Sequence, residues 1–209
     1  WQNCRKNTDM SIGNPIASQP DMPAFEQIVF GMISVFGRGN EIHFNFKNPR
    51  DQFRFKGKTQ ADLVRFLRRL ENMRVSPMSR PSGNKGVVET PLDLNVDVPS
   101  AIVFALPNNS NMQFSAKGDA VTRKTSAPNP NYCNLRYVRI VAGSELVLES
   151  EPFDGCKALV FFAKSPPPAP DEYKHGFDLH VDILQRSASG TEQVLPIIID
   201  PDVRNPGGN

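Results

Sequence analysis

The feature that most constrains the fold is a strict alternation of apolar and polar residues in the second half of the chain. Every second residue from Phe177 to Ile183 is apolar, and the residues between them are acidic or histidine. The stretch from Leu92 to Val98 alternates in the same way. Successive side chains of a β-strand point to opposite faces, so both stretches predict strands with one buried and one solvated face.

Further short apolar segments follow one another at spacings of about 10 to 20 residues, with proline, glycine and asparagine between them. They cover residues 101–106, 112–116, 135–141, 145–150, 158–163 and 194–199. Many short strands without any helical period predict an antiparallel, immunoglobulin-like β-sandwich over residues 87–209. Pro196 lacks the N–H that a central strand must donate, and therefore predicts that the last long strand lies at a sheet edge.

The first half predicts a separate, small β-β-β-α unit over residues 24–75. Two β-rich runs flank a Gly-Arg-Gly-Asn turn, and a third short strand precedes the helix. Thr59 is a favourable N-cap, and Asp62 falls in the first turn, where the helix dipole favours an acid. Apolar side chains at positions 63, 66, 67, 70 and 73 share one face, with three arginines opposite. Residues 1–23 are interpreted as a polar arm and residues 76–86 as a linker. The fold class is thus mainly β, or α+β overall.

Charge is distributed unevenly along the chain. Residues 47–85 contain eleven Lys or Arg against three Asp or Glu, whereas residues 86–209 contain ten against fifteen. A strongly basic segment predicts an anionic partner, which could be a phosphate backbone, an acidic protein or a lipid headgroup. The candidate contacts are Arg54, Lys56, Lys58, Arg65, Arg68 and Arg69. The alternative is a solvated helix face, with the basic unit docked on the chain's own acidic sandwich.

Sequence motifs for catalysis, cofactors or metals are not found. The chain has no Gly-x-Ser-x-Gly, His-Glu-x-x-His, P-loop or Cys-x-x-Cys pattern, so no catalytic, cofactor-binding or metal-ligating residue is predicted. His180 lies between Asp178 and Asp182 on one strand face. That trio could bind a hard cation weakly, or it could be the solvated face of a sheet.

The three cysteines are Cys4, Cys133 and Cys156. Their spacing is not that of a metal site, and we expect free, mostly buried thiols. A bridge between Cys133 and Cys156 is the alternative.

The C-terminal run from Gln193 to Pro206 places an apolar strand directly before an Asp200-Pro201 turn. This ending resembles that of small bacterial β-sandwich proteins of the DP-EP type and, more remotely, of the inclusion-body (PixA/AidA-like) type. The resemblance covers at most residues 87–209. It implies a bacterial, non-enzymatic sandwich of unknown role, and it transfers no functional residues.

Three functions are therefore weighed. The first is a non-enzymatic accessory or structural module that docks on a larger assembly or on an acidic partner. The second is nucleic-acid binding through the basic β-β-β-α unit. The third is an enzyme or carbohydrate-binding sandwich with a site built from loops. No apolar run is long enough to cross a bilayer, so a cytoplasmic protein is expected, although a segment upstream of Trp1 is left open.

Overall fold

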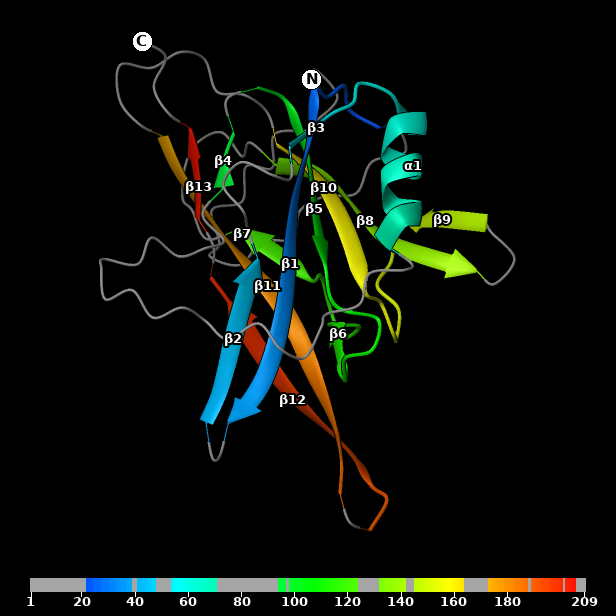
Figure 1. The fold of residues 1–209 in the computed structure, drawn as a ribbon, viewed down its shortest axis with the longest axis vertical. Helices are drawn as coiled ribbons and strands as arrows, with labels where there is room; N and C mark the ends of the chain where they lie inside the picture. The colour runs from blue at the N-terminus through cyan, green and yellow to red at the C-terminus, as the bar shows by residue number, and fades with distance from the viewer. Residues whose placement is uncertain are drawn as a thin grey trace.

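The computed structural model describes residues 22–38, 41–47, 54–70, 94–96, 98–123, 132–141, 145–163, 173–187, 189–200 and 202–205. These residues form two β-sheets and a helix (Figure 1). The predicted mainly-β sandwich is confirmed.

The first sheet has seven strands among the described residues. Its order is β2-β1-β5-β10-β8-β9, and β3 also pairs with β1. The strands are β1 (Gln27–Arg38), β2 (Glu41–Lys47), β3 (Arg54–Lys56), β5 (Ser100–Ala105), β8 (Tyr132–Val141), β9 (Glu145–Glu149) and β10 (Ala158–Ala163). Neighbours are antiparallel except β1 and β5, which run parallel.

The second sheet is organised around the long strand β11 (Tyr173–Arg186). It pairs with β12 (Glu192–Ile199), β13 (Asp202–Asn205), β6 (Met112–Phe114) and β7 (Val121–Arg123), and β13 pairs in parallel with β4 (Leu94–Asn95). β12 ends the strand order of this sheet, so the edge position predicted from Pro196 is confirmed. β7 was not expected from the sequence.

Helix α1 (Gln60–Leu70) begins at the predicted cap. The backbone N–H of Asp62 donates to Thr59 Oγ1 at 3.2 Å, and Thr59 donates from its own N–H and hydroxyl to Asp62 Oδ2 at 3.1 and 2.8 Å. This reciprocal arrangement satisfies amide groups that the first helical turn leaves without partners. The helix then buries the predicted apolar face, namely Leu63, Phe66, Leu67 and Leu70.

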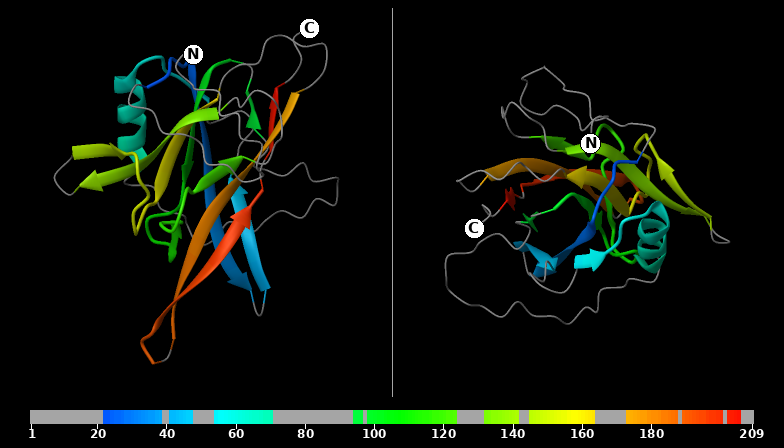
Figure 2. Two further views of the ribbon diagram at one scale, coloured as in Figure 1. Left: turned by 180° about the vertical axis from the view of Figure 1, so that it is seen from behind. Right: turned by 90° about the horizontal axis from the view of Figure 1, so that it is seen from above.

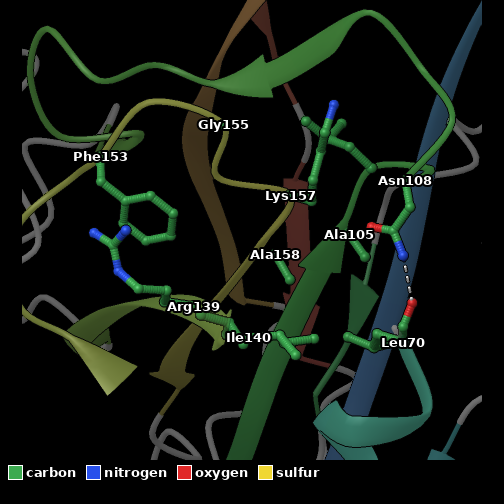
Figure 3. A pocket seen from close by; sticks show the side chains of 11 residues that line it. Leu70, Ala105, Asn108, Arg139, Ile140, Phe153, Gly155, Lys157 and Ala158 are labelled. Carbon is green, nitrogen blue, oxygen red and sulfur yellow. Dashed lines mark hydrogen bonds between the residues drawn. The ribbon is translucent and has the colours of Figure 1, made fainter. Parts of the chain in front are cut away.

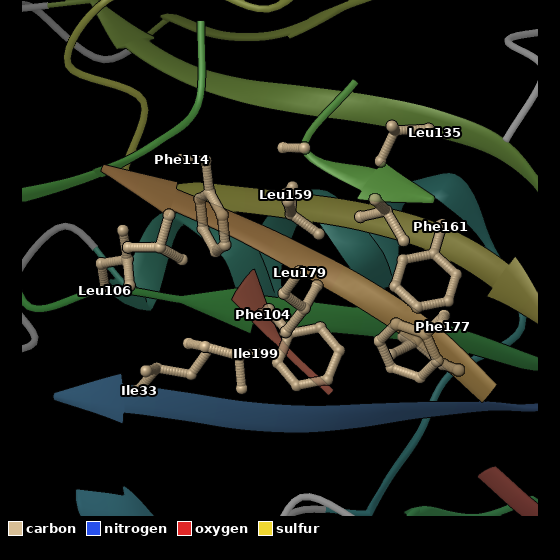
Figure 4. Close-up of a cluster of buried hydrophobic side chains, with 14 of the residues drawn as sticks. Ile33, Phe104, Leu106, Phe114, Leu135, Leu159, Phe161, Phe177, Leu179 and Ile199 are labelled. Carbon is tan, nitrogen blue, oxygen red and sulfur yellow. The ribbon is translucent and has the colours of Figure 1, made fainter. Parts of the chain in front are cut away.

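The described residues bury two hydrophobic clusters, one on each side of the first sheet. Between the sheets, residues of β5 and β10 meet the inward face of β11, among them Phe104, Phe161 and Phe177 (Figure 4). On the opposite face, α1 covers residues such as Phe30, Val103 and Phe162. Figure 2 shows α1 on the outer side of the first sheet, away from β11 and β12. Alternation along each strand explains this division, because odd and even positions serve different clusters.

The predicted β-β-β-α unit and the predicted sandwich contribute neighbouring strands to one sheet. β1 pairs with β5 over six residues, from Gln27 opposite Ser100 to Met32 opposite Ala105. In addition, α1 packs on β5, β8 and β10 as well as on β1. The division into domains at residues 76–86 stays a prediction, since that segment lies outside the described residues, as do residues 1–21 of the expected arm.

Within the part of the chain that the structure describes, no helix combines the length and apolarity needed to cross a membrane.

Candidate functional site

A pocket of about 350 Å³ lies where β5 ends and β10 begins, beyond the C-terminal end of α1 (Figure 3). Its floor forms because Ala105 of β5 and Ala158 of β10 are direct cross-strand partners. On its other side, Ala158 is paired with Val138 of β8. Two adjacent alanines project only methyl groups from the sheet. Since α1 ends at Leu70, the helix does not fill the space above them.

One wall of the pocket combines an arginine with an aromatic ring. The guanidinium carbon of Arg139 lies 3.8 Å from the centre of the Phe153 ring, which is a cation–π distance. Arg139 Nε donates to Glu149 Oε1 at 2.9 Å, across the β8–β9 pair. The side chain remains 43% exposed, so its carboxylate partner orients the guanidinium without removing it from solvent.

The loop between β9 and β10 forms a second wall and is held by several specific bonds. The Gly155 N–H donates to Gln113 Oε1 at 2.8 Å, and Gly155 adopts a φ of 81°, which favours glycine. The Phe114 N–H donates to the carbonyl of Cys156. Lys157 Nζ donates to the carbonyls of Ser110, at 2.9 Å, and Met112. Burial lowers the pKa of Lys157.

The side of the pocket next to α1 is closed by Asn108. Its Nδ2 donates at 3.1 Å to the carbonyl of Leu70, one of the final carbonyls that the helix leaves without an internal partner. Asn108 thereby joins the end of the helix to the loop after β5. Figure 3 shows Asn108 and Leu70 on one side of the pocket and Arg139 with Phe153 on the other.

The pocket thus has an apolar floor with polar groups around its rim. Its volume lies within the range of about 300 to 1,000 Å³ that is typical of small-molecule sites. A flat apolar ring could contact the floor, while a negatively charged group could bind the exposed guanidinium of Arg139. No catalytic residue is identified by this geometry alone.

The structure places the sequence-predicted cations elsewhere, around α1. Lys56, Lys58, Arg65, Arg68 and Arg69 are exposed, as the sequence predicted. Arg54 lies on β3 opposite Val29, and its side chain is outside the description. Arg65 makes a 3.7 Å ion pair with Asp62 and keeps 70% of its side chain exposed. None of the five side chains that the structure describes here lines the pocket.

The Asp178, His180 and Asp182 trio occupies one face of β11, and no metal-type group of His, Cys, Asp or Glu occurs among the described residues. His180 Nε2 lies 2.8 Å from Thr122 Oγ1, so the ring has a structural partner on β7. Cys156 is a free, buried thiol, as expected, whereas Cys4 and the side chain of Cys133 are outside the description.

Sequence reasoning missed the pocket residues. The available signal was a polar turn between two predicted strands, residues 150–157, which combines phenylalanine, glycine and lysine. Binding residues are often found on such loops. Arg139 could not be singled out, because its partners come from β9 and from this loop.

Fold and pocket together define a β-sandwich protein with a pocket where β5 ends and β10 begins. Residues 39–208 match the model of the family pNTSase1, described as a predicted novel nucleotide synthetase, and the chain belongs to this family. No curated protein matches the chain, and no solved structure matches it.

The family match corrects two predictions. The resemblance to DP-EP and PixA/AidA-like proteins was wrong, because the match is to a different family and extends into the basic first half. A short apolar strand followed by Asp-Pro is too common an ending to identify a family. The main functional prediction, a non-enzymatic structural or protein-interaction module, was also wrong, since the family description points to an enzyme.

Proposed function

We propose that this protein is an enzyme of nucleotide synthesis that binds a nucleotide in the pocket at the end of α1. The single observation that supports this site best is that the Arg139–Phe153 pair lines the same pocket as the apolar floor of Ala105 and Ala158. A nucleotide has a flat ring and a polyanion, and the pocket offers a matching group for each. The family description supports the same class of substrate.

In this arrangement the base lies on the alanine floor at the α1 side of the sheet, and Phe153 lines the same pocket from the other side. The phosphates extend toward the rim, where the guanidinium of Arg139 provides planar donors suited to phosphate oxygens. Glu149 holds Arg139 in place through Nε and leaves its terminal nitrogens available. Lys157 contributes positive potential, while its bonds to Ser110 and Met112 fix the loop.

The compartment proposed for this activity is the cytoplasm, where nucleotides are supplied. The free thiol of Cys156 supports that choice, because cytosolic proteins keep their thiols reduced.

The test measures binding of ATP, GTP, CTP and UTP with Mg²⁺ by isothermal titration calorimetry, and follows their conversion by chromatography and mass spectrometry. Arg139→Ala should weaken binding about 10- to 150-fold, since a hydrogen bond to a charged group is worth about 1.5 to 3 kcal/mol. Arg186→Ala removes an exposed arginine from the far end of β11 and is the matched control.

A second pair of variants tests the pocket floor. Ala158→Leu fills the space above the sheet and should abolish nucleotide binding, whereas Ala61→Leu adds the same side chain at an exposed position of α1 and should leave binding unchanged. Circular dichroism and melting temperature establish that both variants fold. Failure of the wild-type protein to bind or convert any nucleotide would overturn the proposal, as would equal nucleotide affinities of the Ala158→Leu and Ala61→Leu variants.

A further inference from the structure

The outer surface of α1 and the turn before it present four cations that the pocket does not use. We define the α1 basic face as Lys58, Arg65, Arg68 and Arg69. We propose that this face binds the phosphate backbone of a single-stranded nucleic acid. The inference goes beyond the proposed nucleotide enzyme and stands on a different surface.

The arginines face solvent for a structural reason. Helix positions advance by 100° per residue, so burial of Leu63, Phe66, Leu67 and Leu70 on the sheet directs positions 65, 68 and 69 outward. Packing of α1 on the sheet therefore fixes their direction, and the three guanidinium groups share the outer side of a rigid element.

Few acids offset these charges in the described segments around α1. Asp62 is committed to the helix cap through three hydrogen bonds and lies 3.7 Å from Arg65. Glu26 is exposed and precedes Gln27, the cross-strand partner of Lys56. Four cations against these two carboxylates leave an excess of positive charge, which complements a polyanion.

The chemistry of the face favours nucleic acid over a membrane. A helix that binds a lipid surface inserts exposed apolar side chains, but the apolar side of α1 is buried on the sheet. The large hydrophobic residues exposed in the described part of the chain, Val194, Leu195 and Ile198, all belong to β12.

The same chemistry favours nucleic acid over an acidic protein. Protein interfaces usually centre on large buried aromatic or apolar anchors, and the apolar residues of α1 outside its buried face are only Ala61 and the half-buried Val64. Arginine, rather than lysine, occupies all three helical positions, and its planar fork matches phosphate oxygens. α1 is about 16 Å long, so one strand can contact cations along its whole length.

The test measures fluorescence anisotropy of a labelled oligothymidylate long enough to pass the whole of α1, between about 50 and about 200 mM salt. The variant Arg68→Gln/Arg69→Gln removes two charges from the basic face, while Lys117→Gln/Arg186→Gln removes two exposed charges elsewhere. Each neutralised phosphate contributes about −0.7 to the slope of log affinity against log salt, so the first variant should flatten that slope by about 1.4. The control should retain the wild-type slope.

Three results would overturn the proposal: no oligonucleotide binding by the wild-type protein at low salt, an equal loss in both variants, or tighter binding of polyglutamate or of phosphatidylserine-containing vesicles. Nucleotide calorimetry on the same proteins separates this inference from the proposed function. Ala158→Leu should lose nucleotide binding and keep the oligonucleotide slope, whereas Arg68→Gln/Arg69→Gln should do the reverse.

Discussion

The close approach of β1 and β5 leads to a specific stability prediction at Gly31. Gly31 and Phe104 are cross-strand partners, and a methyl group at Gly31 would lie 2.7 Å from Cε1 and 2.9 Å from Cδ1 of the Phe104 ring. Carbon atoms in favourable contact are about 3.5 Å apart or more, so the ring would have to move by about 0.8 Å.

The surrounding packing resists that movement. Phe104 is fully buried, and its ring centre lies 6.2 Å from that of Phe161 and 5.8 Å from that of Phe177. Overpacking of this kind costs about 1 to 3 kcal/mol, which for a chain of this size lowers Tm by about 2 to 12 °C. Gly31→Ala should show this loss in thermal and urea unfolding, although alanine is normally preferred to glycine within a strand.

The control is Gly118→Ala, where the added methyl group meets nothing within 4 Å. We expect its stability to be unchanged or slightly raised. In a double-mutant cycle, Phe104→Leu should reduce the cost of Gly31→Ala, because the smaller side chain leaves room for the methyl group. Equal melting temperatures for the two alanine variants would refute the β1–β5 register and the single continuous sheet.

Two further predictions concern titratable groups. Hydrogen bonds from Thr59 and from nearby backbone amides lower the pKa of Asp62. The carboxylate therefore stabilises the fold at pH values above its unfolded-state pKa, near 3.8, and this stabilisation is lost as the pH falls through the lower pKa of the folded state. Asp62→Asn should therefore melt below the wild type at pH 7 and match it in strong acid, and a difference that persists in acid would contradict the cap. Burial raises the pKa of Cys156 to about 12, so in a Cys4→Ser/Cys133→Ser background this thiol should react with Ellman's reagent at pH 8 only after unfolding. Rapid reaction of the native protein would show that Cys156 is accessible.

Secondary structure was largely predictable because its signals are local. Alternation in the sequence predicted β11, and short apolar segments between turn residues predicted β5, β8, β10 and β12, within a few residues of their observed bounds. The N-cap at Thr59 and the periodic apolar residues predicted α1 and its buried face. β7 was missed, since its three residues are too few for a period to be recognised.

Function was less predictable from local patterns. The basic charge of residues 47–85 drew attention to an anionic partner, but not to the pocket, whose cations are Arg139 and Lys157 in the acidic half of the chain. The family match reaches from residue 39 to residue 208 and changes the expected class from a structural module to an enzyme. No short motif in the sequence indicated that class.

The sequence by itself determined which segments are extended, where the helix begins, and which side of each element is apolar, because those properties depend on neighbours a few residues apart. Tertiary structure decided that β1 joins β5 in parallel, and that Ala105 and Ala158 lie side by side in the pocket that Arg139 and Phe153 also line. The β1–β5 and β5–β10 pairings bring together residues about 50 positions or more apart, and no local periodicity specifies which partners will meet.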